Sequence, residues 1–433
     1  AVLPKLAAWR RDFHAHPEAG WTEFRTAALI IRRLRELGYA IRMGEAACAS
    51  DRRMGVPSSA VLAAARERAL EHGADAELVA GMGDGYTGFW ADLDCGPGPV
   101  TAFRFDMDCN EVAECAEESH RPVREGFASR WPGLMHACGH DGHAAVGLGL
   151  AEVLVSIRRH LRGRIRLIFQ PAEEGARGAL PMSEAGAVDG VDVLFGFHIG
   201  FKAEGPGSLI CGTQGFLATT KRDVLFSGVP AHAGAAPEEG KDALLAACSA
   251  VVNLHAISRN GKGGTRIAVG RLEGGEARNV IPASARLFME TRGETTELDA
   301  YMTAESERIL RASADLWGCA CEWRTVGNSA GGGSSPELAR LIATVAEAMG
   351  GWKTVIPMSG FGATEDFACL MSRVQASGGL ASYLQVGTDR AAGHHSDRFD
   401  FDETCLGRAL ELLARLAVRM AGGGQEDTET ETE

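Results

Sequence analysis

Apolar and polar positions follow two different periods along this chain of 433 residues. The stretches LAAWRRDF, from residue 6, and FRTAALIIRRLRELGY, from residue 24, carry apolar residues at helical spacing. The second stretch reaches Gly38, a residue type that often ends a helix, and residues 61–80 are also helical in pattern. Short apolar runs that begin near residues 100, 164, 191 and 381 instead predict buried strands.

Helical segments separate several of these strands, the clearest being HAAVGLGLAEVLVSIRRHL from residue 143. Strands that alternate with helices predict an α/β fold with a mostly parallel sheet covered on both faces. Ligands of such sheets gather beyond the carboxyl ends of the strands. Polar residues stand at these ends in every case: Asp106, Asp108, Glu173, Glu174, His198, His394 and His395.

The pattern changes between residues 216 and 327. TTKRDVLFSG, TRIAVGRLEGG and SARLFMETRG look like antiparallel strands with one polar face, and two longer segments look helical. We therefore expect a smaller α+β domain, residues 216–327, inserted into a larger domain of residues 1–215 and 328–421. The return linker VGNSAGGGSSPEL is rich in Gly and Ser, as a flexible hinge would be. A chain of this length is also too long for one ordinary core.

The net charge of −13 argues against nucleic acid or anionic lipid as the main partner. Part of this charge lies in residues 422–433, GGGQEDTETETE, for which we expect a disordered acidic tail. We find no apolar stretch long enough to span a membrane and no signal-peptide pattern at the start. The eleven cysteines form no CxxC and suit free thiols, so we expect a cytoplasmic protein.

The stretch MHACGHDGH, residues 135–143, concentrates coordinating side chains. A lone histidine is more often a satisfied buried side chain than a ligand, and a lone cysteine is more often a small buried hydrophobe. Here, thiolate, imidazole and carboxylate groups recur at strand ends from residue 138 to residue 395, a spread that disfavours a local structural zinc module. The set exceeds the needs of one four-coordinate ion and suits two Zn²⁺ or Mn²⁺ ions about 3.5–4 Å apart. It comprises Cys138, His140, Glu174, His198 and His395.

Two adjacent glutamates in QPAEEG, Glu173 and Glu174, point in different directions. One can bind metal while the other faces the attacking water as general base, with a pKa raised by partial desolvation. Two exposed glutamates at a helix start are the alternative. GDGYTG, residues 83–88, matches GxGxxG, but it follows a helix and precedes a strand, the wrong context for a dinucleotide.

MHACGHDGH, QPAEEG, HIG and HHSDRFDFDE resemble the M20 metallopeptidase family, in its branch of amidohydrolases that cleave N-acyl amino acids. The resemblance covers nearly the whole chain, including FRFDMD, VPAHAGAAPEEGKDALLAA and ARNVIPASARLFMETRG. It implies that the five ligands hold a pair of ions and that Glu173 passes a proton from water to the leaving amine. His395 is preferred to His394 because HSDRF resembles the branch pattern His-Ser-Pro-x-Phe, with Asp397 in place of the proline.

The same resemblance makes the inserted domain a lid and dimerisation domain. It implies that His232 stabilises the oxyanion in a partner's site and that Asn279 and Arg292 hold the substrate carboxylate. Asp106 and Asp108 would orient a metal-bound imidazole. Alternatively, Asn279 is an asparagine at a strand edge and Arg292 is a solvated arginine. Asp106 and Asp108 can also simply cap the loop that follows them. Glu365 and Asp366 are further candidates for a supporting role at the metal site, and helix capping explains them equally well.

SDRRMGVP, GDGYTGFWADLDCG and SHRPVREGFAS extend the resemblance to members that hydrolyse p-aminobenzoyl-glutamate, a folate breakdown product, to p-aminobenzoate and glutamate. The alternatives are a broader N-acyl amino acid deacylase and a subunit that is silent without its partner. A homodimer and a heterodimer with a related B subunit are both open. DMDCNEVAEC departs from the sequence usual in the family after this motif and is expected to shape the pocket.

Overall fold

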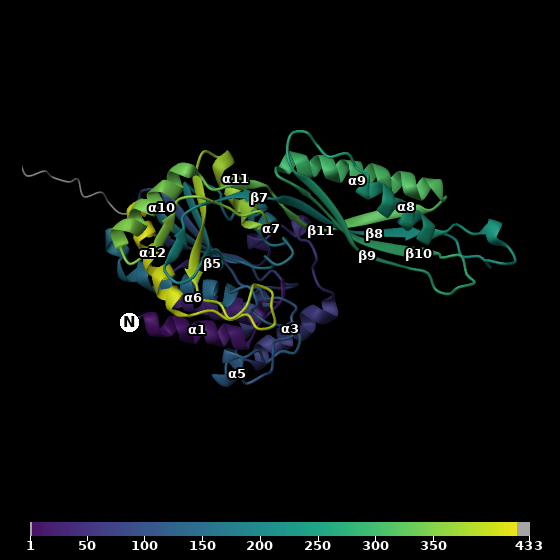
Figure 1. Ribbon diagram of the computed structural model, residues 1–433. Helices are drawn as coiled ribbons and strands as arrows, with labels where there is room; N and C mark the ends of the chain where they lie inside the picture. Colours follow the sequence, from purple (N-terminus) through teal and green to yellow (C-terminus); the bar gives the residue numbers. More distant parts are fainter. Residues whose placement is uncertain (1, 422–433) are drawn as a thin grey trace, which may run out of the picture.

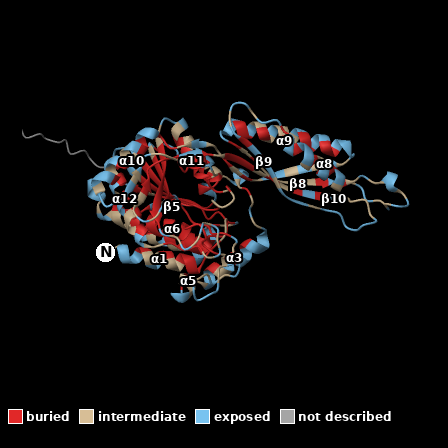
Figure 2. Cartoon of the chain, viewed as in Figure 1, coloured by how far each residue is buried: buried red, intermediate tan, exposed pale blue. Residues whose placement is uncertain are grey.

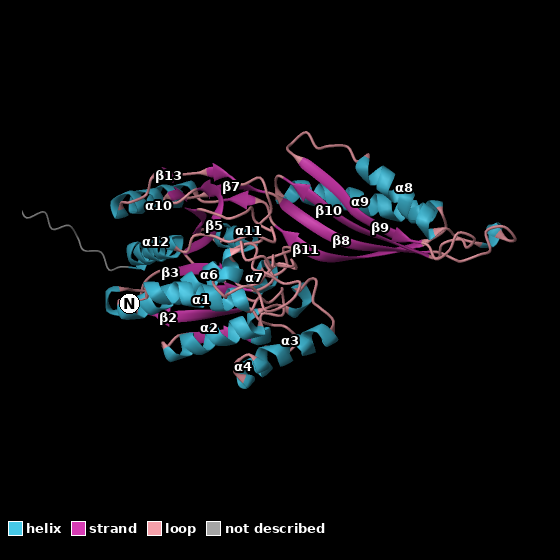
Figure 3. Ribbon diagram, turned by 60° about the horizontal axis from the view of Figure 1, so that its bottom comes forward, coloured by secondary structure: helices cyan, strands magenta, loops and turns pink. Residues whose placement is uncertain are grey.

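The computed structural model describes residues 2–421, which form a larger and a smaller body (Figure 1). The larger body has a mostly parallel sheet with helices on both faces, and the smaller body has an antiparallel sheet with two helices on one face (Figure 3). The predicted α/β fold with an additional α+β unit is confirmed. The predicted acidic tail, residues 422–433, lies outside the described residues. No helix in the described part is long and apolar enough to cross a membrane.

The four apolar runs of the sequence form the centre of an eight-stranded sheet with the order β1-β2-β4-β3-β5-β15-β6-β13. Of its central strands, β3 is parallel to β4 and β5, and β15 is parallel to β5. Towards the edges, β2 runs antiparallel to β4, and β6 runs antiparallel to β15. The strands are β1 (Ala40–Met43), β2 (Phe89–Asp94), β3 (Val100–Asp106), β4 (Arg164–Gln170), β5 (Val193–Glu204), β6 (Ser208–Ile210), β13 (Thr354–Ile356) and β15 (Leu380–Thr388). A second, three-stranded sheet joins β7 (Thr213–Phe216), β12 (Gly332–Gly333) and β14 (Ser359–Gly360).

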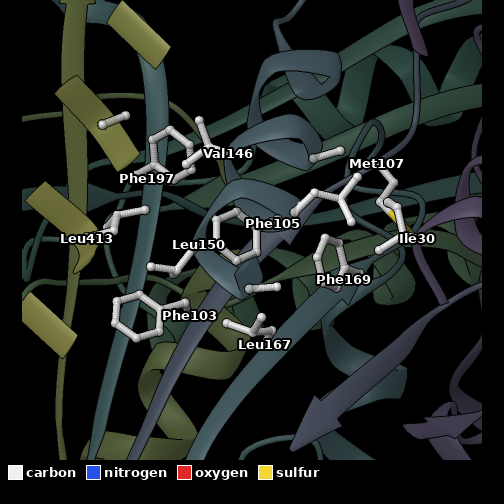
Figure 4. Close-up of a cluster of buried hydrophobic side chains, with 14 of the residues drawn as sticks. Ile30, Phe103, Phe105, Met107, Val146, Leu150, Leu167, Phe169, Phe197 and Leu413 are labelled. Atoms are coloured by element: carbon white, nitrogen blue, oxygen red, sulfur yellow. The ribbon is translucent and has the colours of Figure 1, made fainter. Parts of the chain in front are cut away.

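Successive side chains of the central strands point to opposite faces, so the sheet carries two cores, both deeply buried (Figure 2). Phe103 and Phe105 pack in the core with α6 and α12 (Figure 4), whereas Ala102 packs in the core with α7 and α11. Gly147 allows α6 to approach the sheet, since a Cβ there would lie 2.8 Å from the Phe169 ring. The helices of this body are α1 (Leu3–Ala15), α2 (Phe24–Glu36), α3 (Ser59–Glu71), α4 (Ala76–Gly81), α5 (Arg121–Arg124), α6 (His140–Ser156), α7 (Ala179–Glu184), α10 (Pro336–Met349), α11 (Phe367–Ala376) and α12 (Thr404–Ala421).

The smaller body is a sheet of four antiparallel strands in the order β11-β8-β10-β9. Two helices cover one face, where Val224, Leu287 and Leu310 form a separate core. The elements are β8 (Ala218–Ser227), α8 (Ala243–His255), β9 (Thr265–Gly274), β10 (Ser284–Gly293), α9 (Thr296–Leu316) and β11 (Ala320–Ser329). β11 continues two residues past the predicted end of the inserted domain at residue 327. The limits of the two domains therefore remain a prediction.

Candidate functional site

The carboxyl ends of β3 and β4 lie beside the middle of β5, the loop before α6 and the loop after β15, and the five predicted ligands lie at this point. His198 is inside β5, which continues to Glu204, and does not end its strand as the sequence suggested. Their ligand atoms form overlapping sets within 4.8 Å of one another: Cys138, His140 and His198 in one, and Cys138, Glu174 and His395 in another. Cys138 Sγ lies 3.4 Å from His198 Nε2, and His395 Nε2 lies 3.3 Å from Glu174 Oε1. The structure therefore brings residues from four separate parts of the chain into one cluster.

The ring orientation of the histidines leaves one nitrogen facing this cluster. His140 Nδ1 donates to the Asp108 carbonyl oxygen at 2.9 Å, and His198 Nδ1 donates to the Ile199 carbonyl oxygen at 2.8 Å. His140 Nε2 and Glu174 Oε1 are buried without a hydrogen-bond partner within the described residues. Buried polar atoms are normally satisfied, so both atoms call for a ligand. Thiolate, imidazole and carboxylate are suitable ligands for Zn²⁺ or Mn²⁺, and the residues thus fit metal ions.

His395, rather than its neighbour His394, borders Glu174. Its backbone has a positive φ of 65°, a strained conformation for a residue with a side chain, and its N–H donates to the Ala137 carbonyl oxygen at 2.8 Å. The nearby Cys138 thiol and Glu174 carboxylate raise the pKa of His395 to about 10. His394 instead accepts a hydrogen bond from Arg390 and donates to the Ile199 carbonyl oxygen.

The two aspartates at the end of β3 hold the site in different ways. The Asp108 carboxylate accepts hydrogen bonds from the backbone N–H groups of Glu173, at 3.0 Å, and Glu174, at 2.9 Å. Asp106 accepts a hydrogen bond from His143 Nδ1 at 2.6 Å. Asp108 therefore positions the loop of the two glutamates with its side chain and His140 with its backbone carbonyl group.

Glu173 lies beside a buried charged network whose acidic members, Glu365 and Asp366, were ambiguous in the sequence. Its carboxylate, 13% exposed, is 3.9 Å from His140 Nε2 and belongs to a second carboxylate cluster with Glu365 and Asp366. Burial, together with the charges of Glu365 and Glu174, raises the pKa of Glu173 well above its usual value. A carboxyl group with a raised pKa beside a metal-ligand cluster has the chemistry of a general base.

Arg104 on β3 compensates the negative charge of Glu365 and Asp366 in this network. Its guanidinium lies 3.0 Å from Glu365 and 3.3 Å from Asp366, and Tyr383 donates a hydrogen bond to Glu365 at 2.6 Å. Asp366 accepts hydrogen bonds from Gly178 and Ala179 at the start of α7. Helix capping, one interpretation of the sequence, is therefore part of the role of Asp366, but the helix that it caps is not its own.

The predicted residues of the smaller body lie at its two opposite ends. His232, in the loop after β8, and Asn279, in the loop between β9 and β10, are neighbours, and Ala233 N–H donates to the Asn279 carbonyl oxygen at 3.0 Å. Arg292 lies at the other end of the ten-residue strand β10 and forms an ion pair with Glu290 at 2.8 Å. A strand of this length spans about 30 Å, so one chain does not bring Asn279 and Arg292 to one carboxylate.

The fold and this cluster define a hydrolase, and the chain belongs to Peptidase family M20/M25/M40, whose sequence profile matches residues 102–419. It is 46% identical to the A subunit of p-aminobenzoyl-glutamate hydrolase from Escherichia coli (strain K12) over 420 residues, 96% of each chain. It is 45% identical to indole-3-acetyl-aspartic acid hydrolase of Enterobacter agglomerans over 419 residues, again 96% of each. The family prediction is confirmed.

Solved structures show the same relationship. The aminobenzoyl-glutamate utilization protein from Klebsiella pneumoniae is 39% identical, with a TM-score of 0.82 over 96% of this chain and 95% of that one. The YXEP protein of Bacillus subtilis, described as a dinuclear metal binding peptidase of the M20 family, is 25% identical, with a TM-score of 0.65 over 97% and 98%.

Proposed function

We propose that this protein hydrolyses the amide of p-aminobenzoyl-glutamate to p-aminobenzoate and glutamate. The observation that carries the proposal is the convergence of five metal-ligating side chains, with unpartnered atoms on His140 and Glu174 among the described residues, beside the carboxylate of Glu173. The substrate is suggested by the names of relatives that share 46% and 39% of their residues with this chain. An aromatic acyl-aspartate is the second candidate, because another relative of nearly equal similarity is named for one.

The proposed ligands of two divalent ions, Mn²⁺ or Zn²⁺, are Cys138, His140, Glu174, His198 and His395. When bound, such ions lower the pKa of a water molecule and polarise the amide carbonyl. Glu173 takes the proton of the attacking water and delivers it to the leaving amine. Asp108 holds the backbone of Glu173 and Glu174 in place by accepting hydrogen bonds from both N–H groups. Cys138 belongs to both of the ligand sets described above, so its thiolate would help to hold the ions.

The proposal is tested by metal-dependent release of p-aminobenzoate. Purified protein is freed of metal, loaded with Mn²⁺ or Zn²⁺, and supplied with p-aminobenzoyl-glutamate or indole-3-acetyl-aspartate. We expect turnover of the first substrate only after loading, with about two ions bound per chain. Failure to bind metal, or turnover of neither substrate by protein with two bound ions, would contradict the proposal.

A second chain is part of the proposed active unit, either a second copy or a related B subunit. Two relatives are named as the A subunit of a hydrolase or as its homologue, and His232 lies in an exposed loop after β8. All eleven cysteines are free, which suits the cytoplasmic location expected from the sequence.

We expect His232→Ala to lower kcat by about 10²- to 10³-fold, because a donor aimed at the developing oxyanion is lost. If His232 acts across a homodimer, mixing this variant with Glu173→Gln protein restores activity, since mixed dimers contain one complete site. The measurement is kcat before and after the chains are exchanged between dimers. No recovery, despite exchange shown by mass-tagged chains, would exclude action across such a dimer.

A further inference from the structure

A cavity of about 630 Å³ adjoins the candidate metal centre on the side of α3. Glu174 belongs both to its lining and to the metal-ligand cluster, so a group held at the cluster has direct access to this space. The opposite wall is α3 with the segment before it. Pro57, Val61, Ala64 and Arg68 line this wall, and Arg177, from the segment between β4 and α7, also lines the cavity.

The α3 wall is apolar where a surface helix is normally polar. Leu62, Ala65 and Ala69 are buried against the larger body. Val61 and Ala64, one turn apart, are exposed and line the cavity, and Val61 is 51% exposed. A helix with a second apolar stripe facing an open cavity indicates an apolar ligand, because exposed apolar side chains gain from being covered.

Within the described part of the chain, two guanidinium groups border the same space with a buried nitrogen left unsatisfied. Nε of Arg68 and Nε of Arg177 are buried and have no hydrogen-bond partner within residues 2–421. Arg177 packs against Gly55 and Gly175, where an added Cβ would lie 3.0 Å and 2.6 Å from its Nε. Arg68 already lies over one ring, 5.2 Å from the centre of Trp131.

Guanidinium groups stack favourably on electron-rich aromatic faces. Glu111 and Glu174 also line the cavity and oppose the entry of a free anion. Apolar walls, guanidinium groups that can stack on a ring and acidic neighbours together favour a flat, uncharged aromatic group over a carboxylate or a phosphate.

We propose that this cavity is the acyl-group subsite and that it selects substrates with a flat aromatic acyl group. The inference rests on the proposed function, since the substrate's amide must lie at the metal cluster for its acyl group to enter here. Its consequence is that substrate choice on the acyl side is set by α3 and the segment before it, at a distance from the residues of the smaller body that are predicted to hold the amino acid.

The test fills the cavity from its exposed wall. Ala64→Trp places a bulky side chain in the space without touching the core, because Ala64 is exposed. Ala63→Trp makes the same change at an exposed position of α3 that is not part of the lining and serves as the matched control. Both are combined with Glu173→Gln, and the dissociation constants of p-aminobenzoyl-glutamate and N-acetyl-glutamate are measured by calorimetry on metal-loaded protein.

We expect Ala64→Trp to weaken binding of p-aminobenzoyl-glutamate by at least about tenfold and binding of N-acetyl-glutamate by less than about threefold. Ala63→Trp should change neither. Equal weakening of both ligands, no weakening of either, or failure of Glu173→Gln protein with Ala64 intact to bind p-aminobenzoyl-glutamate would overturn the inference. Failure of the proposed function is seen separately, as binding without turnover in protein that retains Glu173.

Discussion

Replacing Glu173 by glutamine lowers kcat for p-aminobenzoyl-glutamate by about 10²- to 10⁴-fold, the usual contribution of a general base. Glutamine keeps the size of the side chain but cannot accept the proton of the attacking water. Glu173 is not one of the five proposed ligands, so the variant should still bind two ions per chain. The measurements are steady-state kinetics and metal content by mass spectrometry.

Glu174→Gln is the control for this prediction. The two glutamates are adjacent, and both backbone N–H groups are held by Asp108. Loss of the Glu174 carboxylate should reduce metal content as well as activity, and excess metal should restore part of the activity. Full activity in Glu173→Gln protein would show that another group takes the proton.

Replacing Arg104 by methionine lowers the free energy of unfolding by about 3–5 kcal/mol, because removing one partner of a buried ion pair leaves uncompensated buried charge. The guanidinium is fully buried and lies within 3.3 Å of Glu365 and Asp366 and 2.5 Å of Asp106. Methionine retains most of the apolar volume of the side chain, so the decrease in the free energy of unfolding measures the effect of removing the positive charge. Urea unfolding followed by fluorescence measures it.

Arg324→Met is the matched control, since Arg324 forms a single ion pair with Asp223 at 2.8 Å and is 78% exposed. Exposed pairs contribute about 0–1 kcal/mol. If both variants lose the same small amount of stability, the network around Arg104 is not a structural support of the site.

The sequence predicted the larger sheet because buried parallel strands are continuous apolar runs. β3, β4, β5 and β15 all correspond to such runs, and the ligand candidates other than His198, which lies inside β5, stand in the loops that follow or at the start of the next helix. The smaller antiparallel sheet was predictable for a related reason, since one of its faces is polar. Glu365 and Asp366 were ambiguous, because acidic residues before a helix also serve as caps.

Local pattern thus determined the fold class, the family and the set of ligand candidates, because strand periodicity and ligand type are properties of short segments. Only the tertiary structure decided which polar atoms of the described residues are left without partners, as on His140 and Arg177. It also decided that Asn279 lies before the start of β10 while Arg292 lies near its end, and that Ala64 faces a cavity. These features depend on which distant segments come to lie side by side, and burial, pKa and access to a ligand are set by that packing.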